Sequence, residues 1–211
     1  NATSGWGVDK DKLNITMSDV MLGKKLLKDT IIATDYKNLW LAPSTPHLAN
    51  TEAELAQAER RFSRLKVAIE SVANQYDFIL IDSPPSLSLL TVNGLIAARY
   101  ILLPVQAEFY ALEGLGQLLE TMKLVRKNIN PTLDLLGVLP TMINSRTSLS
   151  QQVYEEIKQH FPGKVFKQTI PRNIRLAEAP SYGVPIGEYD KWSKGARAYK
   201  AVAKEVIERV G

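Results

Sequence analysis

The stretch YDFILIDSPPS, residues 76–86, decides the fold of this chain. Its centre, residues 78–81, is a run of four apolar residues, three of them aromatic or β-branched strand formers. A run that is apolar on both faces is typical of a buried parallel strand covered by helices on each side. Pro84 and Pro85 cannot continue a central strand, because proline has no amide hydrogen to donate. We therefore predict a buried strand over residues 78–81 that ends at Asp82.

The position of Asp82 carries a functional hypothesis. A carboxylate at the C-terminal end of a buried parallel strand lies where open α/β sheets bind ligands. A strand that ends in Asp has the form of a Walker B segment, in which the carboxylate helps to hold Mg²⁺ beside nucleotide phosphates. The alternative is an aspartate that only caps the turn after the strand, and this segment by itself leaves both open.

Composition narrows the class of protein. The 211 residues are 45% hydrophobic and 23% charged, with a net charge of +4, which predicts a soluble globular domain with a sizeable core. The absence of cysteine excludes disulfides and cysteine-ligated metal centres, and His47 and His160 are isolated in sequence. No apolar run has the length of a membrane span and no signal peptide is evident, so we expect a cytoplasmic protein without a membrane anchor.

Strands and helices are predicted to alternate along the chain. Besides residues 78–81, apolar runs predict strands over 39–42, 100–105, 135–141 and 165–170. Helical periodicity predicts helices over 15–28, 51–73, 87–98, 111–128, 147–161 and 193–210, with a loop over 171–187. This alternation indicates an α/β fold with a doubly wound, mostly parallel sheet flanked by helices.

Four segments together resemble one family. They are NATSG at 1–5, YDFILIDSPPSLSLLTVNGL at 76–95, PVQAEFYALEG at 104–114 and PRNIRLAEAPSYGVPI at 171–186. In this order and spacing they resemble the ParA/Soj family of chromosome- and plasmid-partitioning ATPases, a deviant Walker-type group. The resemblance extends from Asn1 to Gly211.

The sequence departs from the family pattern at its beginning. Members open with a P-loop, KGGVGKTT, and carry a DxDPQG segment before NATSG, and neither segment occurs here. We therefore expect residues 1–211 to be a single domain, the C-terminal four-fifths of a ParA-type ATPase domain. Its fold would be P-loop NTPase-like with the first strands missing. Because the phosphate-binding lysine and backbone cradle are absent, we expect no ATP hydrolysis by these residues alone.

The resemblance implies roles for individual residues, with ordinary turns or packing as the alternative. Asp82 would be the catalytic carboxylate that holds the Mg²⁺ shell of bound ATP. Contacts to the nucleotide base would come from Met142, Pro171, Arg172 and Asn173. The nucleotide-sensing switches and the dimer interface would include Asn1, Ala2, Thr3, Ser4, Ser83, Pro84, Pro85, Gln106 and Glu108.

The resemblance also implies a cycle. ATP and Mg²⁺ would bridge a homodimer that binds DNA on the nucleoid without sequence preference. A ParB-like centromere-binding partner would stimulate hydrolysis. Arg146 and Arg175 match the positions that carry the DNA contact in the family, and the alternative is that they are solvated or pair with Glu178.

Two other classes remain open. A relative of the membrane-cycling, division-positioning MinD group would need a lipid-binding terminal helix, whereas a non-enzymatic DNA-binding module would need no P-loop. In the terminal helix, Tyr199, Val202, Val206 and Val210 form one narrow apolar stripe, with Glu205 and Glu208 among the basic residues. This stripe favours packing on the core over insertion into lipid.

Overall fold

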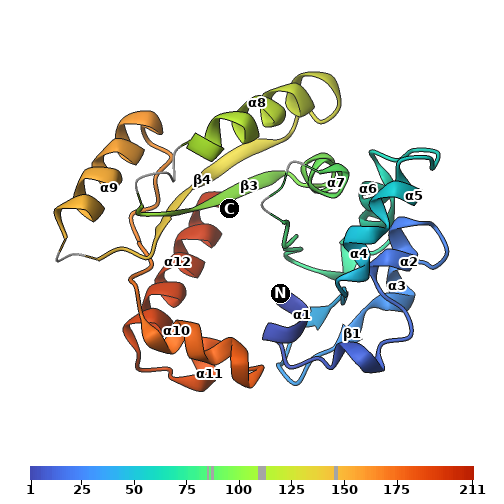
Figure 1. Cartoon of the computed structure of the whole chain (residues 1–211), viewed down its shortest axis with the longest axis horizontal. Helices are drawn as coiled ribbons and strands as arrows, with labels where there is room; N and C mark the ends of the chain where they lie inside the picture. The colour runs from blue at the N-terminus through green and yellow to red at the C-terminus, as the bar shows by residue number, and fades with distance from the viewer. Residues whose placement is uncertain (85, 87, 109–112, 145–146) are drawn as a thin grey trace. The chain divides into compact units, whose positions relative to one another are not determined.

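The computed structural model describes residues 1–84, 86, 88–108, 113–144 and 147–211 (Figure 1). These residues form two compact units. The first unit comprises residues 1–98 with 128–131, and the second comprises residues 99–127 with 132–211. Each unit has its own buried apolar clusters.

The first unit consists mainly of short helices. They are α1 (Ala2–Gly5), η1 (Lys10–Lys12), α2 (Met17–Met21), α3 (Leu27–Thr30), α4 (His47–Asn50), α5 (Glu52–Leu55), α6 (Arg64–Glu70), η2 (Ala73–Gln75) and α7 (Leu89–Ala97). The strands β1 (Ile32–Ala33) and β2 (Trp40–Leu41) pair antiparallel, so the strand predicted over 39–42 forms in part. The core contains two clusters, one around Val20, Leu27 and Val72 and one around Met21, Leu55 and Leu65.

The helix predicted over 15–28 is wrong beyond Met21. Thr16 begins α2 with a capping box, in which its hydroxyl accepts the Ser18 amide hydrogen and Asp19 accepts the Thr16 amide hydrogen. Gly23 has φ +74°, a left-handed conformation that glycine adopts without steric strain. The chain therefore turns at Gly23, and α3 begins separately at Leu27.

The long helix predicted over 51–73 is also interrupted, and the cause is the buried side chain of Asn93. In a continuous helix the Leu65 amide would donate to the Arg61 carbonyl. Instead, Asn93 Nδ2 donates to the Arg61 carbonyl at 2.7 Å, and Asn93 Oδ1 accepts from the Leu65 amide at 3.3 Å. The side-chain amide of Asn93, a residue of α7, thus takes both partners of one helical hydrogen bond. Arg60, which precedes Arg61, adopts φ +55°.

The buried strand predicted over residues 78–81 does not form in this structure. The exposed fractions of the side chains are 51% for Phe78, 40% for Ile79 and 90% for Leu80. A strand requires a hydrogen-bonded neighbour, and none of the described residues forms a β-bridge with this segment. Residues 78–81 therefore have the apolar composition of a buried strand but pair with no other strand in the described part of the chain.

The second unit contains the parallel sheet. Strands β3 (Tyr100–Gln106) and β4 (Asp134–Thr141) pair in parallel, from Tyr100 opposite Asp134 to Gln106 opposite Thr141. The helices of this unit are α8 (Glu113–Asn128), α9 (Ser148–His160), α10 (Ile174–Glu178), η4 (Ala179–Tyr182), α11 (Ile186–Tyr189) and α12 (Lys194–Val210). In Figure 1, α8 and α12 lie on opposite sides of the strand pair, and the interior of β4 is buried throughout. This confirms a parallel α/β arrangement flanked by helices.

Three short helices fill the segment that was predicted to be a loop, residues 171–187, so that prediction is wrong in detail. Pro180 lies in the first turn of η4, where a missing amide hydrogen costs nothing. Gly183 follows η4 in the left-handed conformation and ends it. Gly195, in the first turn of α12, packs closely on Leu176 of α10. A methyl group on Gly195 would lie only 2.5 Å from that side chain, so the close approach requires glycine.

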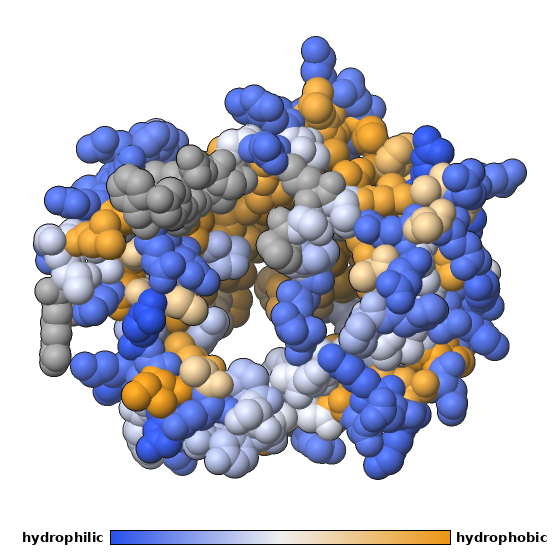
Figure 2. Space-filling view, in the orientation of Figure 1, coloured by the Kyte–Doolittle hydropathy of each residue, from blue (hydrophilic) through white to orange (hydrophobic). Residues whose placement is uncertain are grey.

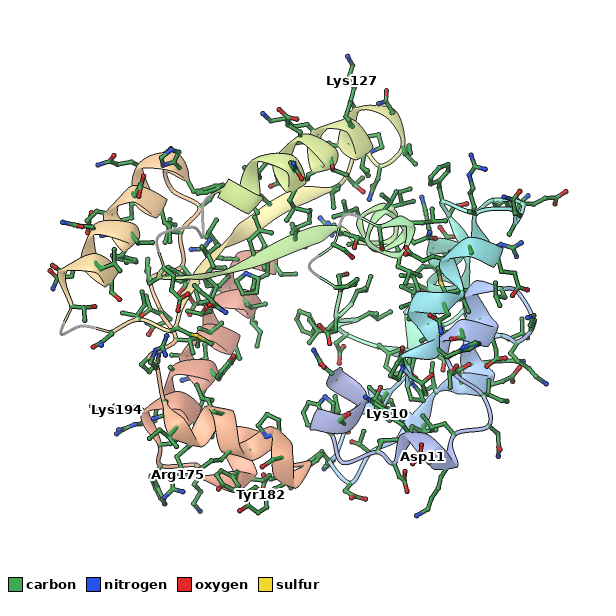
Figure 3. All side chains as sticks on the ribbon, viewed as in Figure 1. Lys10, Asp11, Lys127, Arg175, Tyr182 and Lys194 are labelled. Carbon is green, nitrogen blue, oxygen red and sulfur yellow. The ribbon has the colours of Figure 1, made fainter. Side chains whose placement is uncertain are left out.

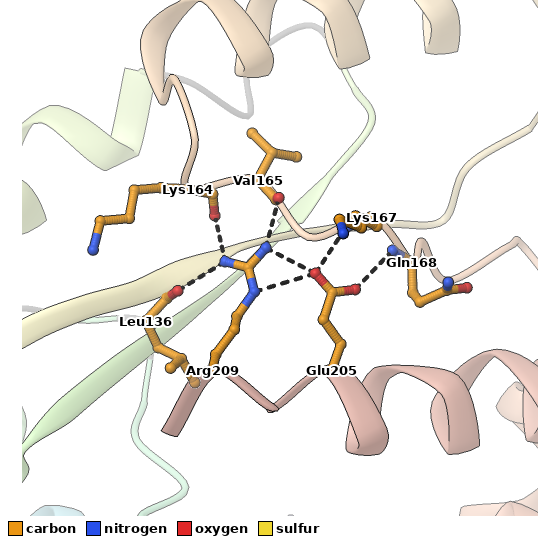
Figure 4. Close-up of polar contacts among 7 residues, drawn as sticks. All are labelled: Leu136, Lys164, Val165, Lys167, Gln168, Glu205 and Arg209. Carbon is orange, nitrogen blue, oxygen red and sulfur yellow. Dashed lines mark hydrogen bonds and ion pairs between the residues drawn. The ribbon is translucent and has the colours of Figure 1, made fainter. Parts of the chain in front are cut away.

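The strand predicted over 165–170 is reduced to single parallel bridges, Val138 with Val165 and Ile143 with Pro171. The reason is visible in Figure 4. Glu205 of α12 accepts the amide hydrogens of Lys167 at 2.9 Å and Gln168 at 3.1 Å. Because the Glu205 side chain takes these two amide hydrogens, Lys167 and Gln168 do not pair with β4.

The same carboxylate accepts hydrogen bonds from Arg209 one turn later in α12, at 2.8 and 3.1 Å. Arg209 also donates to the carbonyl oxygens of Leu136, Lys164 and Val165, and its guanidinium lies 4.1 Å from the centre of the Phe166 ring. Gly137 makes room for this contact, since a methyl group there would lie 2.6 Å from Arg209 Nη1. The pair of Glu205 and Arg209, which sequence reasoning did not single out, fixes α12 to the sheet.

Hydrophilic residues dominate the visible surface of each unit in Figure 2, interrupted by apolar patches. Large exposed apolar side chains include Phe62 and Leu80 in the first unit and Ile174 and Trp192 in the second. None of the helices within the described ranges has the length and apolar character needed to traverse a bilayer.

Candidate nucleotide and DNA sites

In the first unit, the structure brings Asp82 to the N-terminal segment. Asp82 Oδ2 accepts a hydrogen bond from the Ala2 amide at 3.3 Å, across 80 positions in sequence. The carboxylate is exposed, so it remains accessible to water or a cation. Two segments that the sequence assigned to the nucleotide site are therefore neighbours.

The four residues assigned to the first switch differ in their surroundings. Asn1 and Ser4 are exposed and Ala2 is half-buried, whereas Thr3 is buried and its hydroxyl accepts the Ser44 amide hydrogen at 3.0 Å. Thr3 therefore anchors α1 to the loop before α4. This contact is structural, and it holds the neighbouring Ala2 amide beside Asp82.

The turn after Asp82 packs against α7. A methyl group at Gly94 would lie 3.2 Å from Ser83 Oγ, so this glycine permits a close approach of the turn. Ser83 and Pro84 are exposed. Pro85, predicted as part of the same switch, lies outside the described residues.

In the second unit, predicted site residues gather at the C-terminal edge of the parallel strands. Gln106 ends β3, and Met142 directly follows β4. Arg172 Nη2 lies 3.0 Å from Glu108 Oε1, which links the loop after β3 to the segment after the Pro171 bridge. Brought together by the strand register, these residues occupy the edge where parallel α/β sheets bind ligands.

Met142 has an unusual backbone conformation, with φ +53°. Left-handed geometry costs a residue with a side chain of order 1 kcal/mol, and such positions concentrate at functional sites. Its side chain is 41% exposed, which leaves it available to contact a planar ligand.

Asn173 offers a buried acceptor at the same edge of the sheet. Its Oδ1 atom is buried and has no hydrogen-bond partner among the described residues. Buried polar atoms in folded proteins are nearly always paired, so this acceptor is suited to a donor supplied by a bound molecule. An exocyclic amino group, such as that of adenine, has the required chemistry.

Of the two arginines predicted to contact DNA, Arg146 lies outside the described residues and Arg175 is held in ion pairs. Arg175 Nη1 lies 3.0 Å from Glu178 Oε2, and its Nε lies 3.5 Å from Asp190 Oδ2. The pairing with Glu178 that the sequence left open is thus present. Figure 3 shows that Arg175, Tyr182 and Lys194 lie at the same corner of the second unit.

No group of three or more His, Asp or Glu side chains capable of holding a metal occurs among the residues that the structure describes. A Mg²⁺ site of the predicted type does not need one. Mg²⁺ commonly takes one or two carboxylates and completes its shell with water and substrate phosphates. Asp82 is compatible with that role.

Comparison with known proteins identifies the family. The family model described as an AAA domain matches residues 1–135. The sporulation initiation inhibitor protein Soj of Bacillus subtilis is 50% identical over 206 residues, which cover 98% of this chain and 81% of Soj. The chromosome partitioning protein ParA of Myxococcus xanthus is 43% identical over 209 residues, covering 99% of this chain and 74% of ParA.

A solved structure confirms the fold. The cobyrinic acid a,c-diamide synthase of Mycobacterium smegmatis, with bound ADP and magnesium, superposes with a TM-score of 0.84 at 34% identity. The alignment covers 99% of this chain and 77% of that protein. The fold is therefore that of P-loop NTPase-like α/β proteins. Because its sequence identity is higher to Soj and ParA than to this synthase, the chain belongs to the Soj/ParA family of chromosome-partitioning ATPases.

Proposed function

We propose that this chain is the nucleotide-switching part of a DNA-segregation ATPase that hydrolyses ATP with Mg²⁺. The observation that carries the proposal is that Asn173 Oδ1, buried at the ligand-binding edge of a parallel sheet, has no hydrogen-bond partner in the part of the chain that the structure describes. It supports adenine recognition there, with Met142, Pro171 and Arg172 as neighbours in the same site. ADP and magnesium in a relative at 34% identity support the same ligands.

Asp82 is proposed to hold the Mg²⁺ shell, and the segment Asn1–Ser4 and the turn Ser83–Pro85 are proposed to respond to the nucleotide. The hydrogen bond between Asp82 and the Ala2 amide supports this, because a cation at the carboxylate would compete with that amide. Gln106 and Glu108 are proposed to border the nucleotide and the second subunit.

The 211 residues contain no Gly-x-x-x-x-Gly-Lys-Ser/Thr sequence to hold phosphates. They span 81% of Soj and 74% of ParA. We propose that they act as the C-terminal part of one ATPase domain, together with a phosphate-binding loop in a longer polypeptide. The apolar segment 78–81, which pairs with no strand among the described residues, supports this, because a neighbouring strand would satisfy its backbone.

The biological output is proposed to be segregation of DNA. In this proposal the ATP-bound protein forms a homodimer, binds DNA on the nucleoid through Arg146 and Arg175, and is stimulated to hydrolyse ATP by a ParB-like centromere-binding protein. Arginine suits such a contact, because its planar guanidinium can donate two hydrogen bonds to one phosphate. The names of the Soj and ParA relatives support the partitioning role.

A membrane-cycling role is less well supported. Val202 of α12 is buried in the apolar cluster of the second unit, and Val206 and Val210 pack against it. The stripe that would face lipid is therefore used to bind the sheet, although Tyr199 at its start is 46% exposed.

The test is Mg²⁺-dependent ATP hydrolysis by the complete protein carrying Asp82→Asn. Asp77→Asn is the matched control, because Asp77 is exposed and lies five positions earlier in the same segment. We expect Asp82→Asn to lower hydrolysis at least tenfold and the control to leave it unchanged, with both variants unfolding at the parental temperature. Full activity in Asp82→Asn, or equal losses in both variants, would contradict the assignment.

A further inference from the structure

The guanidinium of Arg175 is already occupied by carboxylates. Nη1 faces Glu178 Oε2 at 3.0 Å, and Nε faces Asp190 Oδ2 at 3.5 Å. A guanidinium holds a phosphate bidentately through Nη2 together with either Nη1 or Nε, so a carboxylate already faces one nitrogen of each possible pair. Within this group of three side chains, one positive charge lies against two negative charges, so the charge of Arg175 is more than balanced.

Both carboxylates are held in place by other partners. Glu178 Oε2 accepts a second hydrogen bond from the Tyr189 hydroxyl at 3.0 Å, and the Tyr189 ring stacks on Tyr182 with 5.1 Å between centres. Asp190 Oδ1 accepts the Trp192 amide hydrogen at 3.1 Å. If Arg175 turned away to bind phosphate, both carboxylates would remain where they are and would repel it.

We propose that Glu178 and Asp190 set the DNA affinity of this surface by competing with phosphate for Arg175. The inference rests on the proposed DNA contact of Arg175 and names the residues that regulate it. The competition keeps binding by one subunit weak. Two such surfaces on one duplex offset this weakening, because linked contacts raise the effective concentration of the second. The affinity for DNA should therefore rise more steeply on dimerisation than it would if Arg175 had no carboxylate partners.

The expected change in DNA affinity can be estimated from the solvent exposure of the three side chains. The side chains are 54% exposed for Arg175, 37% for Glu178 and 32% for Asp190. Water screens ion pairs of this exposure, so neutralising either carboxylate should tighten DNA binding by about two- to fivefold.

The experiment is a fluorescence-anisotropy titration of a labelled duplex with the complete protein in Mg²⁺ and ATP. The variants are Glu178→Gln and Asp190→Asn, in which an amide oxygen can still accept from Tyr189 or Trp192. Glu188→Gln is the matched control, because Glu188 is exposed on α11 and loses the same charge. We expect each test variant to bind about two- to fivefold more tightly than the control variant.

The gain should also depend on Arg175. When Arg175→Ala is already present, adding Glu178→Gln should tighten binding no more than adding Glu188→Gln does. Equal effects of Glu178→Gln and Glu188→Gln in the parent, or a gain that persists without Arg175, would overturn the competition. If Arg175→Ala binds DNA like the parent, the proposed DNA contact fails and the competition fails with it. If Arg175→Ala binds weakly but Glu178→Gln shows no gain, the competition alone fails.

Discussion

Replacing Glu205 with glutamine should destabilise the second unit by about 3 kcal/mol. The carboxylate, only 9% exposed, accepts from the Lys167 and Gln168 amides and from two nitrogens of Arg209. Hydrogen bonds to a charged group contribute about 1.5–3 kcal/mol each, and breaking a buried ion pair costs about 3–5 kcal/mol. We take the lower part of this range, because Arg209 is 21% exposed and keeps three carbonyl partners.

A glutamine cannot reproduce the arrangement, since its NH₂ group would face either an amide hydrogen or the guanidinium. Urea and thermal unfolding of the full chain would measure the effect. For a chain of this size, a loss of about 3 kcal/mol lowers Tm by about 6–12 °C. Glu208→Gln is the matched control on the exposed side of α12 and should change Tm very little.

The difference between the parent and Glu205→Gln should also depend on pH. Burial raises the pKa of Glu205, but the Lys167 and Gln168 amides and Arg209 outweigh it and hold the pKa below its ordinary value of 4.5. For a lowered carboxyl pKa, the stabilisation is complete above pH 4.5 and is lost as the pH falls through the folded-state pKa. A loss below 0.5 kcal/mol at pH 7, or a difference that stays constant down to pH 3, would refute this reasoning.

Three other residues give further predictions. Gly137→Ala should lower the free energy of unfolding by about 2 kcal/mol in urea titrations, because the new methyl group would lie 2.5 Å from the Lys164 carbonyl oxygen and 2.6 Å from Arg209 Nη1; an unchanged midpoint would contradict this. Asn173→Ala should weaken ATP binding by the complete protein about tenfold in calorimetry, since the buried acceptor is lost, and equal affinity would exclude adenine recognition by this side chain. Asn93→Ala should destabilise the first unit by about 2 kcal/mol, because the Arg61 carbonyl and the Leu65 amide lose their buried partner; a stability within 0.5 kcal/mol of the parent would contradict the role given to Asn93.

The sequence predicted the elements whose apolar pattern is satisfied locally. The run before Gln106 and the run before Met142 became β3 and β4, and the periodic segments 147–161 and 193–210 became α9 and α12 within one residue at each end. These elements bury their apolar faces inside the second unit, so pattern and packing agree.

Three of the errors share one physical origin, which is pairing between distant parts of the chain. Asn93 takes the hydrogen bonds that would have continued a helix through Leu65, and Glu205 takes the amides that would have extended a strand past Phe166. No local sequence pattern around Asn93 or Glu205 predicts these contacts. Residues 78–81 have the composition of a buried strand, but a strand also needs a neighbour, and composition does not supply one.

The candidate site was predicted largely through family resemblance. The structure adds geometry that the resemblance did not contain, namely the contact between Asp82 and the Ala2 amide and the ion pair between Glu108 and Arg172. The i, i+3 spacing of Arg175 and Glu178 was a readable signal for their pairing, whereas Asp190 became a neighbour only through the fold. The roles of these residues in nucleotide and DNA binding stay predictions.

Control of DNA binding by the nucleotide can be measured in one titration. The affinity of the complete protein for a duplex would be measured with Mg²⁺ and ATP, with Mg²⁺ and ADP, and without nucleotide, at several salt concentrations. We expect binding at least tenfold tighter with ATP than with ADP. We also expect the affinity to fall steeply with salt and not to depend on duplex sequence, as is typical of phosphate contacts. Equal affinity in all three nucleotide states would show that the nucleotide does not control DNA binding.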